Sequence, residues 1–111
     1  MHKSICPKDR IILALDVETL EDVESLVKEL KDYVGYFKVG LPLIVSYGFE
    51  AVRLIEKLGG KCYYDCKFHD IPNTVQKACI NLVNNNIHYF SVHIQGGSKM
   101  LAGSVKAVKA A

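Results

Sequence analysis

The sequence lacks a strong excess of either charge, which argues against a nucleic-acid-binding protein. The 111 residues carry a formal net charge of only +2. Their charged and aromatic side chains form neither the stripe nor the stacking platform that such binding needs. No apolar run approaches the length of a membrane span, and residues 1–6 lack the apolar core of a signal peptide. We therefore expect a cytoplasmic protein that binds neither nucleic acid nor membrane.

The chain also lacks the cysteine and histidine spacings that would form a disulfide or a metal site. Cys62 and Cys66 are expected on one strand face about 13 Å apart, which is too far to bridge or to share a zinc ion. His88 and His93 fall on opposite faces of a strand. We expect no metal ligands, and we expect buried, reduced cysteines, as in a reducing compartment.

The apolar residues, which make up half of the chain, predict a packed core built from repeated strand–helix units. Strands are expected to begin near residues 11, 36, 62 and 88. The first of them, Arg10–Asp16, is almost continuously apolar, which is typical of a strand buried on both faces.

Helix signals follow each predicted strand. Thr19 and Asp22 form a capping-box pattern at the start of the first helix. Pro42 opens a second helix, which is expected to continue to the Gly59-Gly60 pair. Pro72 and Ser98 mark the starts of two more helices.

The strands begin about 25 residues apart, which favours parallel strands joined by right-handed helical crossovers. Such short units suit an α/β fold of the (β/α)₈ TIM-barrel type, which needs about 250 residues. Residues 1–111 would then be the N-terminal half of a single barrel domain, containing its first four βα units. A complete flavodoxin-like sheet fits the same periodicity and is the alternative.

Polar side chains lie near the C-terminal end of every predicted strand, on the face expected to point inward. They are Asp16, Lys38, Asp65 with Lys67, and His93. A charge in an apolar strand is costly unless it is paired or used. One such residue would be structural, as His93 alone would be, but their recurrence at one end predicts a shared site at the barrel mouth.

The longest polar pattern, residues 65–74, reads Asp-Cys-Lys-Phe-His-Asp-Ile-Pro-Asn-Thr and leads from a strand through a loop into a helix. Alternation along the strand places Tyr63, Asp65 and Lys67 on one face. The acid and the base then lie roughly 6–7 Å apart along the strand. Asp70 follows just beyond the strand end. A solvated ion pair is the alternative interpretation.

These segments resemble the orotidine 5′-phosphate decarboxylase family. The matching pieces follow the family's order and are Leu13–Asp16, Phe37–Gly40, residues 65–74, and Ser91–His93 with Gly96-Gly97. The resemblance spans nearly the whole chain but only the N-terminal half of the family. The family's later phosphate-binding loops have no counterpart here, so we expect a fragment of a longer gene product.

The resemblance implies decarboxylation of orotidine 5′-phosphate to UMP in pyrimidine biosynthesis, without a metal or other cofactor. Lys38, Asp65, Lys67 and Asp70 would form an array of alternating charge. Lys67 would donate a proton to C6 as carbon dioxide leaves, and Asp65 would lie against the departing carboxylate. A positioned ammonium suits this reaction because negative charge develops on a ring carbon.

The resemblance also implies substrate-binding residues and a homodimer with shared active sites. Lys38 and Asp16 would bind the ribose, and Ile71 would contact the substrate. Asp70 and Thr74 would reach into the neighbouring subunit's site. The partners are therefore a small nucleotide and a second copy of the chain.

Two other functions stay open at this point. One is a non-catalytic half-barrel that binds a phosphorylated metabolite. The other is the chemistry of a sister group, the Mg²⁺-dependent sugar-phosphate decarboxylases and aldolases, which shares the D-x-K-x-x-D core. That group has a metal-binding glutamate where this chain has Lys38, so Lys38 and the Ile-Pro-Asn-Thr continuation favour the nucleotide enzyme.

Overall fold

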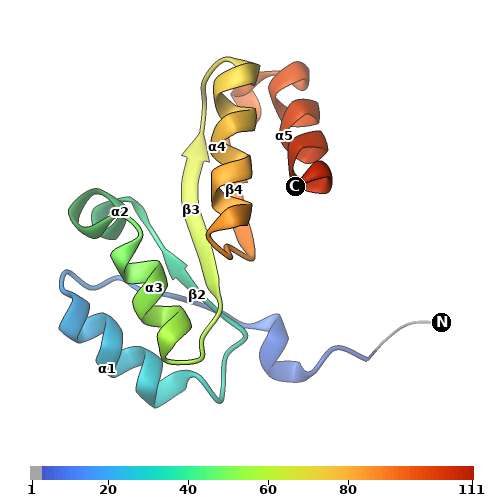
Figure 1. The fold of residues 1–111 in the computed structure, drawn as a ribbon. Coiled ribbons are helices and arrows are strands. Elements are labelled where there is room, and N and C mark those ends of the chain that lie inside the picture. The colour runs from blue at the N-terminus through green and yellow to red at the C-terminus, as the bar shows by residue number, and fades with distance from the viewer. Residues whose placement is uncertain (1–3) are drawn as a thin grey trace.

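The computed structural model describes residues 4–111, which form one four-stranded parallel sheet with helices between the strands (Figure 1). The strand order is β1-β2-β3-β4. The elements are η1 (Pro7–Arg10), β1 (Ile12–Ala14), α1 (Leu20–Leu30), β2 (Tyr36–Val39), α2 (Leu41–Tyr47), α3 (Glu50–Lys57), β3 (Cys62–Phe68), α4 (Pro72–Asn84), β4 (Tyr89–Val92), η2 (Ile94–Gly96) and α5 (Ser98–Ala110).

The order of the strands decides between the two folds that the periodicity allowed. Each strand pairs in parallel with the next one in the sequence. A flavodoxin-like sheet would instead place its second strand outside the first, in the order 2-1-3-4-5. The sequential order is that of a barrel, in which each βα unit lies beside the preceding one.

Two of the predicted helix starts are confirmed in detail. The Thr19 side chain caps α1, because its Oγ1 accepts a hydrogen bond from the backbone N–H of Asp22 at 3.1 Å. Pro72 is in the first turn of α4, after Ile71 in an extended conformation. A proline fits there because its missing N–H has no partner within the helix.

The single helix predicted from Pro42 to the Gly59-Gly60 pair is wrong. The structure has two helices, α2 and α3, with a break at Gly48 and Phe49. Gly48 adopts a φ of +57°, a left-handed conformation that glycine reaches without a Cβ clash. The apolar periodicity continues across the break, which is why the pattern concealed it.

The first strand is shorter and less buried than predicted. It spans Ile12–Ala14 rather than Arg10–Asp16, and Ile12 is 46% exposed. Because β1 pairs only with β2, it is one edge of the sheet, and β4 is the other. The apolar strand β1 is therefore a partly exposed edge strand and not a strand buried on both faces.

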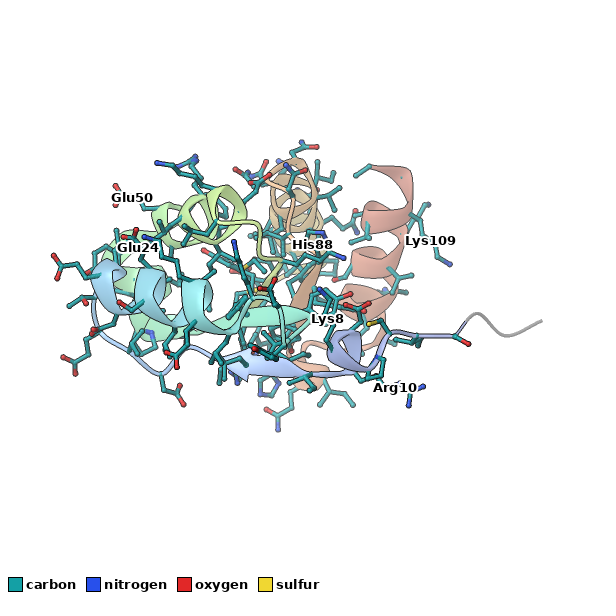
Figure 2. The ribbon with its side chains drawn as sticks, turned by 90° about the horizontal axis from the view of Figure 1, so that it is seen from below. Lys8, Arg10, Glu24, Glu50, His88 and Lys109 are labelled. Atoms are coloured by element: carbon teal, nitrogen blue, oxygen red, sulfur yellow. The ribbon has the colours of Figure 1, made fainter. Side chains whose placement is uncertain are left out.

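The helices cover one face of the sheet and leave the other face open. In Figure 2, seen from below, the green α3 and orange α4 lie above and β1 runs along the lower edge. The main core lies beneath the helices, where Phe37 and Val39 of β2 are at most 1% exposed. On the open face, Tyr89 of β4 is 49% exposed. A second cluster joins α4 and α5 through Val75, Cys79, Met100 and Ala107.

The cysteine prediction holds in part. All four cysteines are free, and Cys62 and Cys79 are buried. Burial raises the pKa of the Cys62 thiol to about 12, which keeps it protonated and unreactive. Cys66 is only half-buried and Cys6 is exposed, so the prediction that all four cysteines are buried is wrong.

Of the helices within residues 4–111, none has both the length and the apolar composition to cross a bilayer.

Phe37 provides a test of the core, because its ring is 1% exposed between the sheet and the helices. Phe37→Ala removes this ring and is expected to lower the free energy of unfolding by about 3–5 kcal/mol. Val45→Ala is the control, since Val45 is 82% exposed on α2, and it should change stability by less than about 0.5 kcal/mol. Urea denaturation measures the unfolding free energy of both variants. Equal losses of stability would contradict the placement of Phe37 in the core.

Candidate active site

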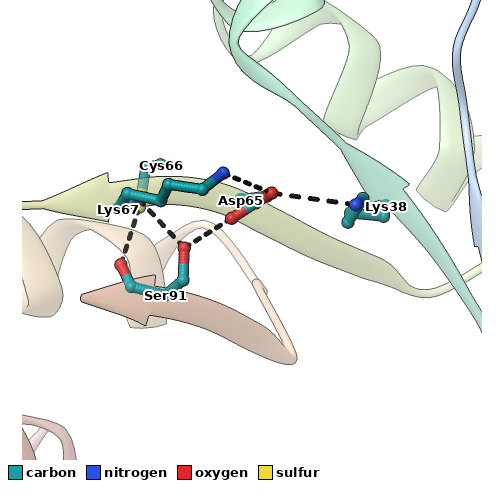
Figure 3. Close-up of polar contacts among 5 residues, drawn as sticks. All are labelled: Lys38, Asp65, Cys66, Lys67 and Ser91. Carbon is teal, nitrogen blue, oxygen red and sulfur yellow. Dashed lines mark hydrogen bonds and ion pairs between the residues drawn. The ribbon is translucent and has the colours of Figure 1, made fainter. Parts of the chain in front are cut away.

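Three charged side chains meet on the open face of the sheet, near the C-terminal ends of β2 and β3 (Figure 3). The Lys67 ammonium donates a hydrogen bond to Oδ2 of Asp65 at 2.7 Å. The Nζ atom of Lys38, on the neighbouring strand, lies 3.8 Å from the same oxygen. The Asp65 side chain is 14% exposed, whereas those of Lys38 and Lys67 are 36% and 56% exposed. One shielded carboxylate thus holds two lysines that face solvent.

The backbone that carries this group is irregular. Between the pairs Tyr64–Phe90 and Phe68–Val92, β3 has three residues where β4 has only Ser91. Lys67, the last residue of this bulge, has a φ of +48°, which is uncommon for a residue with a Cβ. Bulges of this kind redirect side chains next to active sites.

Ser91 joins the group from β4, and the sequence interpretation missed it as a site residue. Its hydroxyl donates to Oδ1 of Asp65 at 2.7 Å and accepts from the backbone N–H of Lys67 at 2.9 Å (Figure 3). The sequence offered one signal for this role, because Ser91 is a polar residue two positions before His93 and so is expected on the same strand face. Its pairing across the bulge depends on the register, which alternation alone does not give.

These contacts lower the pKa of the Asp65 carboxyl below its ordinary value. The largest cause is the hydrogen bond from the Lys67 ammonium. The hydrogen bond from Ser91 and the charges of Lys67 and Lys38 act in the same direction, while partial burial opposes them. Asp65 is therefore ionised at neutral pH.

Two clefts adjoin this group, and Lys67 borders both. The first, of about 530 Å³, is lined by Tyr63, Asp65, Lys67, Ser91 and His93, among others. The second, of about 370 Å³, is lined by residues that include Lys67, Asp70 and Thr74. Both volumes are in the range of small-molecule sites. A ligand in the first cleft would lie directly against the charged side chains.

A third hollow, between β4 and α5, has a different lining. It measures about 340 Å³ and is bordered mainly by apolar side chains, including Phe90, Leu101 and Val108. Such a surface offers few partners to a charged metabolite. The chemistry of its lining therefore makes the first cleft the better candidate for an active site.

The other residues predicted for the site do not join the hydrogen-bonded group, although Asp70 and Thr74 line the second cleft. Within residues 4–111, the Asp70 carboxylate accepts a hydrogen bond from the N–H of Ile71 at 2.7 Å and contacts neither lysine. Asp70, Ile71 and Thr74 are exposed at the start of α4, and Asp16 is exposed beyond the end of β1. Of the four charged residues predicted to form an array, the structure joins Lys38, Asp65 and Lys67 and leaves Asp70 apart.

His93, whose role the sequence left open, has a local structural role. Its Nδ1 accepts a hydrogen bond from the N–H of Gln95 at 3.1 Å. Its ring stacks on that of His69, with the ring centres 4.9 Å apart and the planes inclined by 17°. The ring stacking connects the loop after β3 to the end of β4, and the hydrogen bond holds the turn that follows β4.

The arrangement offers a proton donor but little that would hold a metal. Lys67 presents an exposed ammonium beside a cleft, which can stabilise and then protonate a developing carbanion. In the part of the chain that the structure describes, no three His, Cys, Asp or Glu side chains are grouped as a metal site would require.

Comparison with known proteins gives one family. The model of the orotidine 5′-phosphate decarboxylase / HUMPS family matches residues 9–111. A curated relative from Syntrophomonas wolfei, named orotidine 5′-phosphate decarboxylase, is 47% identical over 102 residues, which are 92% of this chain and 43% of the relative. The relative of the same name from Moorella thermoacetica is 46% identical over 92% of this chain and 40% of its own length.

Solved structures agree with these relatives. The crystal structure of orotidine 5′-monophosphate decarboxylase from Methanocaldococcus jannaschii matches with a TM-score of 0.81 and 32% identity, covering 94% of this chain and 50% of that one. The orotidine 5′-phosphate decarboxylase from Pyrococcus horikoshii matches with a TM-score of 0.74 and 36% identity, covering 89% of this chain and 46% of that one.

The chain spans less than half the length of the curated relatives that it matches. Its four βα units correspond to the first four units of their TIM barrel, which confirms the predicted fold class. The chain belongs to the orotidine 5′-phosphate decarboxylase / HUMPS family.

Proposed function

We propose that this chain forms the N-terminal half of an enzyme that decarboxylates orotidine 5′-phosphate to UMP, a step of pyrimidine biosynthesis. The observation that carries the proposal is Asp65 held between Lys67 and Lys38 on the open face of the sheet. The relatives that match over most of this chain are named for the same activity. The enzyme would be a carboxy-lyase that needs no cofactor.

In the proposed reaction, the bond between C6 of the pyrimidine and its carboxylate breaks, and the electron pair remains on C6. The Lys67 ammonium would deliver a proton to C6. The ammonium would also stabilise the negative charge as it develops, because Asp65 already holds it in position. Asp65 would lie against the departing carboxylate, and carbon dioxide would leave.

Further residues would bind the rest of the substrate. Lys38 would hold Asp65 and a ribose hydroxyl, and Asp16 would bind the ribose from the end of β1. Asp70 and Thr74 are exposed at the rim of the second cleft. This exposure supports a homodimer in which they reach into the neighbouring subunit's site, with Ile71 beside the substrate.

We infer that residues 1–111 are the N-terminal half of one barrel domain. Two features of residues 4–111 support this: β1 and β4 each pair with only one strand, and the open face of the sheet is not covered by the helices. The enzyme would act in the cytoplasm, where free cysteines such as those of this chain stay reduced.

The metal-dependent sister chemistry is less well supported. A divalent cation bound to the Asp65 carboxylate would lie close to the Lys38 ammonium, whose Nζ is 3.8 Å from Oδ2 of Asp65. The repulsion between the two cations would weaken metal binding. A site built on two lysines and one carboxylate instead favours an anionic substrate.

Turnover tests the proposed function most simply. The loss of orotate absorbance would be followed without added metal, using the chain alone and the chain fused to the remaining C-terminal part of the Syntrophomonas wolfei relative. Lys67→Ala should lower kcat of the active form at least about 100-fold, because it removes the proton donor. Lys77→Ala, on the exposed side of α4, should leave kcat unchanged.

Retained turnover in Lys67→Ala would contradict the role of this lysine. Turnover that requires added Mg²⁺ would favour the sister chemistry. A fused protein that binds nucleotide but shows no turnover would support the non-catalytic half-barrel.

Complementation tests the shared active sites. Lys67→Ala and Asp70→Ala would each inactivate the fused enzyme as a homodimer. Mixing the two variants should restore about a quarter of the original activity, because half of the dimers are mixed and each of these has one site with both residues. The absorbance assay measures the mixture after subunit exchange. If no activity returns although exchange is complete, Asp70 acts within its own subunit.

A further inference from the structure

Ser91 is the residue of β4 opposite the bulge, and its hydroxyl contacts both ends of the Asp65–Lys67 segment. It donates a hydrogen bond to Oδ1 of Asp65 at 2.7 Å and accepts one from the backbone N–H of Lys67 at 2.9 Å. Figure 3 shows the hydroxyl between the carboxylate and the lysine backbone. A hydroxyl can serve both roles at once because it carries one proton and two lone pairs.

We propose that Ser91 is a positioning residue, which fixes the Asp65 carboxylate and the backbone of Lys67 so that the lysine ammonium is aimed into the cleft. Its consequence for catalysis rests on the proposed function, whereas its effect on geometry and charge does not. Ser91 acts through these two residues and is not itself a proton donor to the substrate.

The two oxygens of the Asp65 carboxylate have different partners. Ser91 occupies Oδ1, while Lys67 and Lys38 both approach Oδ2. Without a donor at Oδ1, the carboxylate is free to rotate and exchange its oxygens between the two lysines. The serine therefore selects one orientation of Asp65, and with it the position of the Lys67 ammonium.

The Ser91 hydroxyl also holds the backbone of Lys67. Its φ of +48° is a conformation that residues with a Cβ rarely adopt, so neighbouring contacts must hold it. The N–H of Lys67 donates to the Ser91 side chain, which takes the place of a carbonyl in the regular ladder. Two further contacts fix the strands on either side: Cys66 Sγ donates to the carbonyl of Ser91, and the N–H of His93 to that of Phe68.

The Ser91 hydroxyl also stabilises the charged form of Asp65. The hydrogen bond from Ser91 helps to lower the pKa of this carboxyl, after the larger effect of Lys67. The titratable groups that line the same cleft are Tyr63, Lys67 and His93, and Lys38 approaches Asp65 from β2 at 3.8 Å. A substitution at Ser91 leaves all of them in the sequence, so a change in the Asp65 titration reports the lost hydroxyl.

The test compares three variants by NMR of the 111-residue chain. Ser91→Ala removes both hydrogen bonds, and Ser91→Thr keeps a hydroxyl on a residue that suits a strand. Ser25→Ala is the control on the exposed surface of α1. The Asp65 ¹³Cγ shift is titrated from pH 2 to pH 6, and the backbone amide shift of Lys67 is read in the same samples.

We expect Ser91→Ala to raise the titration midpoint of Asp65 and to shift the Lys67 amide. Ser91→Thr and Ser25→Ala should match the original chain in both. Unchanged backbone shifts in α1 show that the variants are folded. An Asp65 midpoint in Ser91→Ala equal to that of the original chain would overturn the proposal, as would a Thr variant that behaves like Ala.

Activity adds a second test in the fused enzyme. Ser91→Ala should lower kcat about 10- to 100-fold with a smaller effect on KM, because it misplaces the proton donor rather than a binding group. Ser91→Thr should restore kcat. A changed Asp65 titration with unchanged kcat would overturn the catalytic part. If the unsubstituted fused enzyme shows no turnover, the proposed function fails and the NMR comparison still decides the positioning role.

Discussion

The Asp65 carboxylate is the interaction on which the rest of the site depends. It accepts hydrogen bonds from the Lys67 ammonium and the Ser91 hydroxyl, and it lies within ion-pair distance of Lys38. These groups come from β2, β3 and β4. A single shielded anion thus ties three neighbouring strands together at their C-terminal ends. In the absence of this anion, two lysine side chains of like charge would be left close to each other on the open face.

The fold makes this cluster possible because the helices cover only one face of the sheet. Side chains such as Phe37 and Val39 fill the covered face, where a charge would be costly. The strand residues that alternate with these apolar ones point to the open face, where Lys38 and Lys67 keep contact with water. In the longer relatives the same face would line the inside of a closed barrel, and its polar residues would surround the mouth.

Much of the fold could be predicted from the sequence because its signals are local. Alternation placed Asp65 and Lys67 on one face, and the capping pattern placed the start of α1 at Thr19. The break between α2 and α3 was missed because it depends on the backbone angle of Gly48, while the apolar spacing continues past it. Strand order, which excludes a flavodoxin-like sheet, is also not encoded in periodicity.

The site was predictable as a set of residues but not as a geometry. The resemblance named Lys38, Asp65, Lys67 and Asp70, and the structure joins the first three. Asp70 lies after the strand end, and loop conformation decides where its carboxylate points. Ser91 was missed because its role arises from the bulge, where three residues of β3 face one of β4. A register shift of this kind has no signal in a single sequence.

The pH dependence of stability tests the central role of the Asp65 carboxylate most directly. Because its pKa is lowered on folding, the ionised group stabilises the fold above its unfolded pKa of about 3.9, and this contribution is lost as pH falls through the folded pKa. The measurement is the difference in unfolding free energy between the original chain and Asp65→Asn, by urea denaturation from pH 2 to pH 7. We predict a difference that rises from the lowest pH in favour of the original chain and is constant above about pH 5. A difference that does not vary with pH, or that rises toward low pH, would contradict the account.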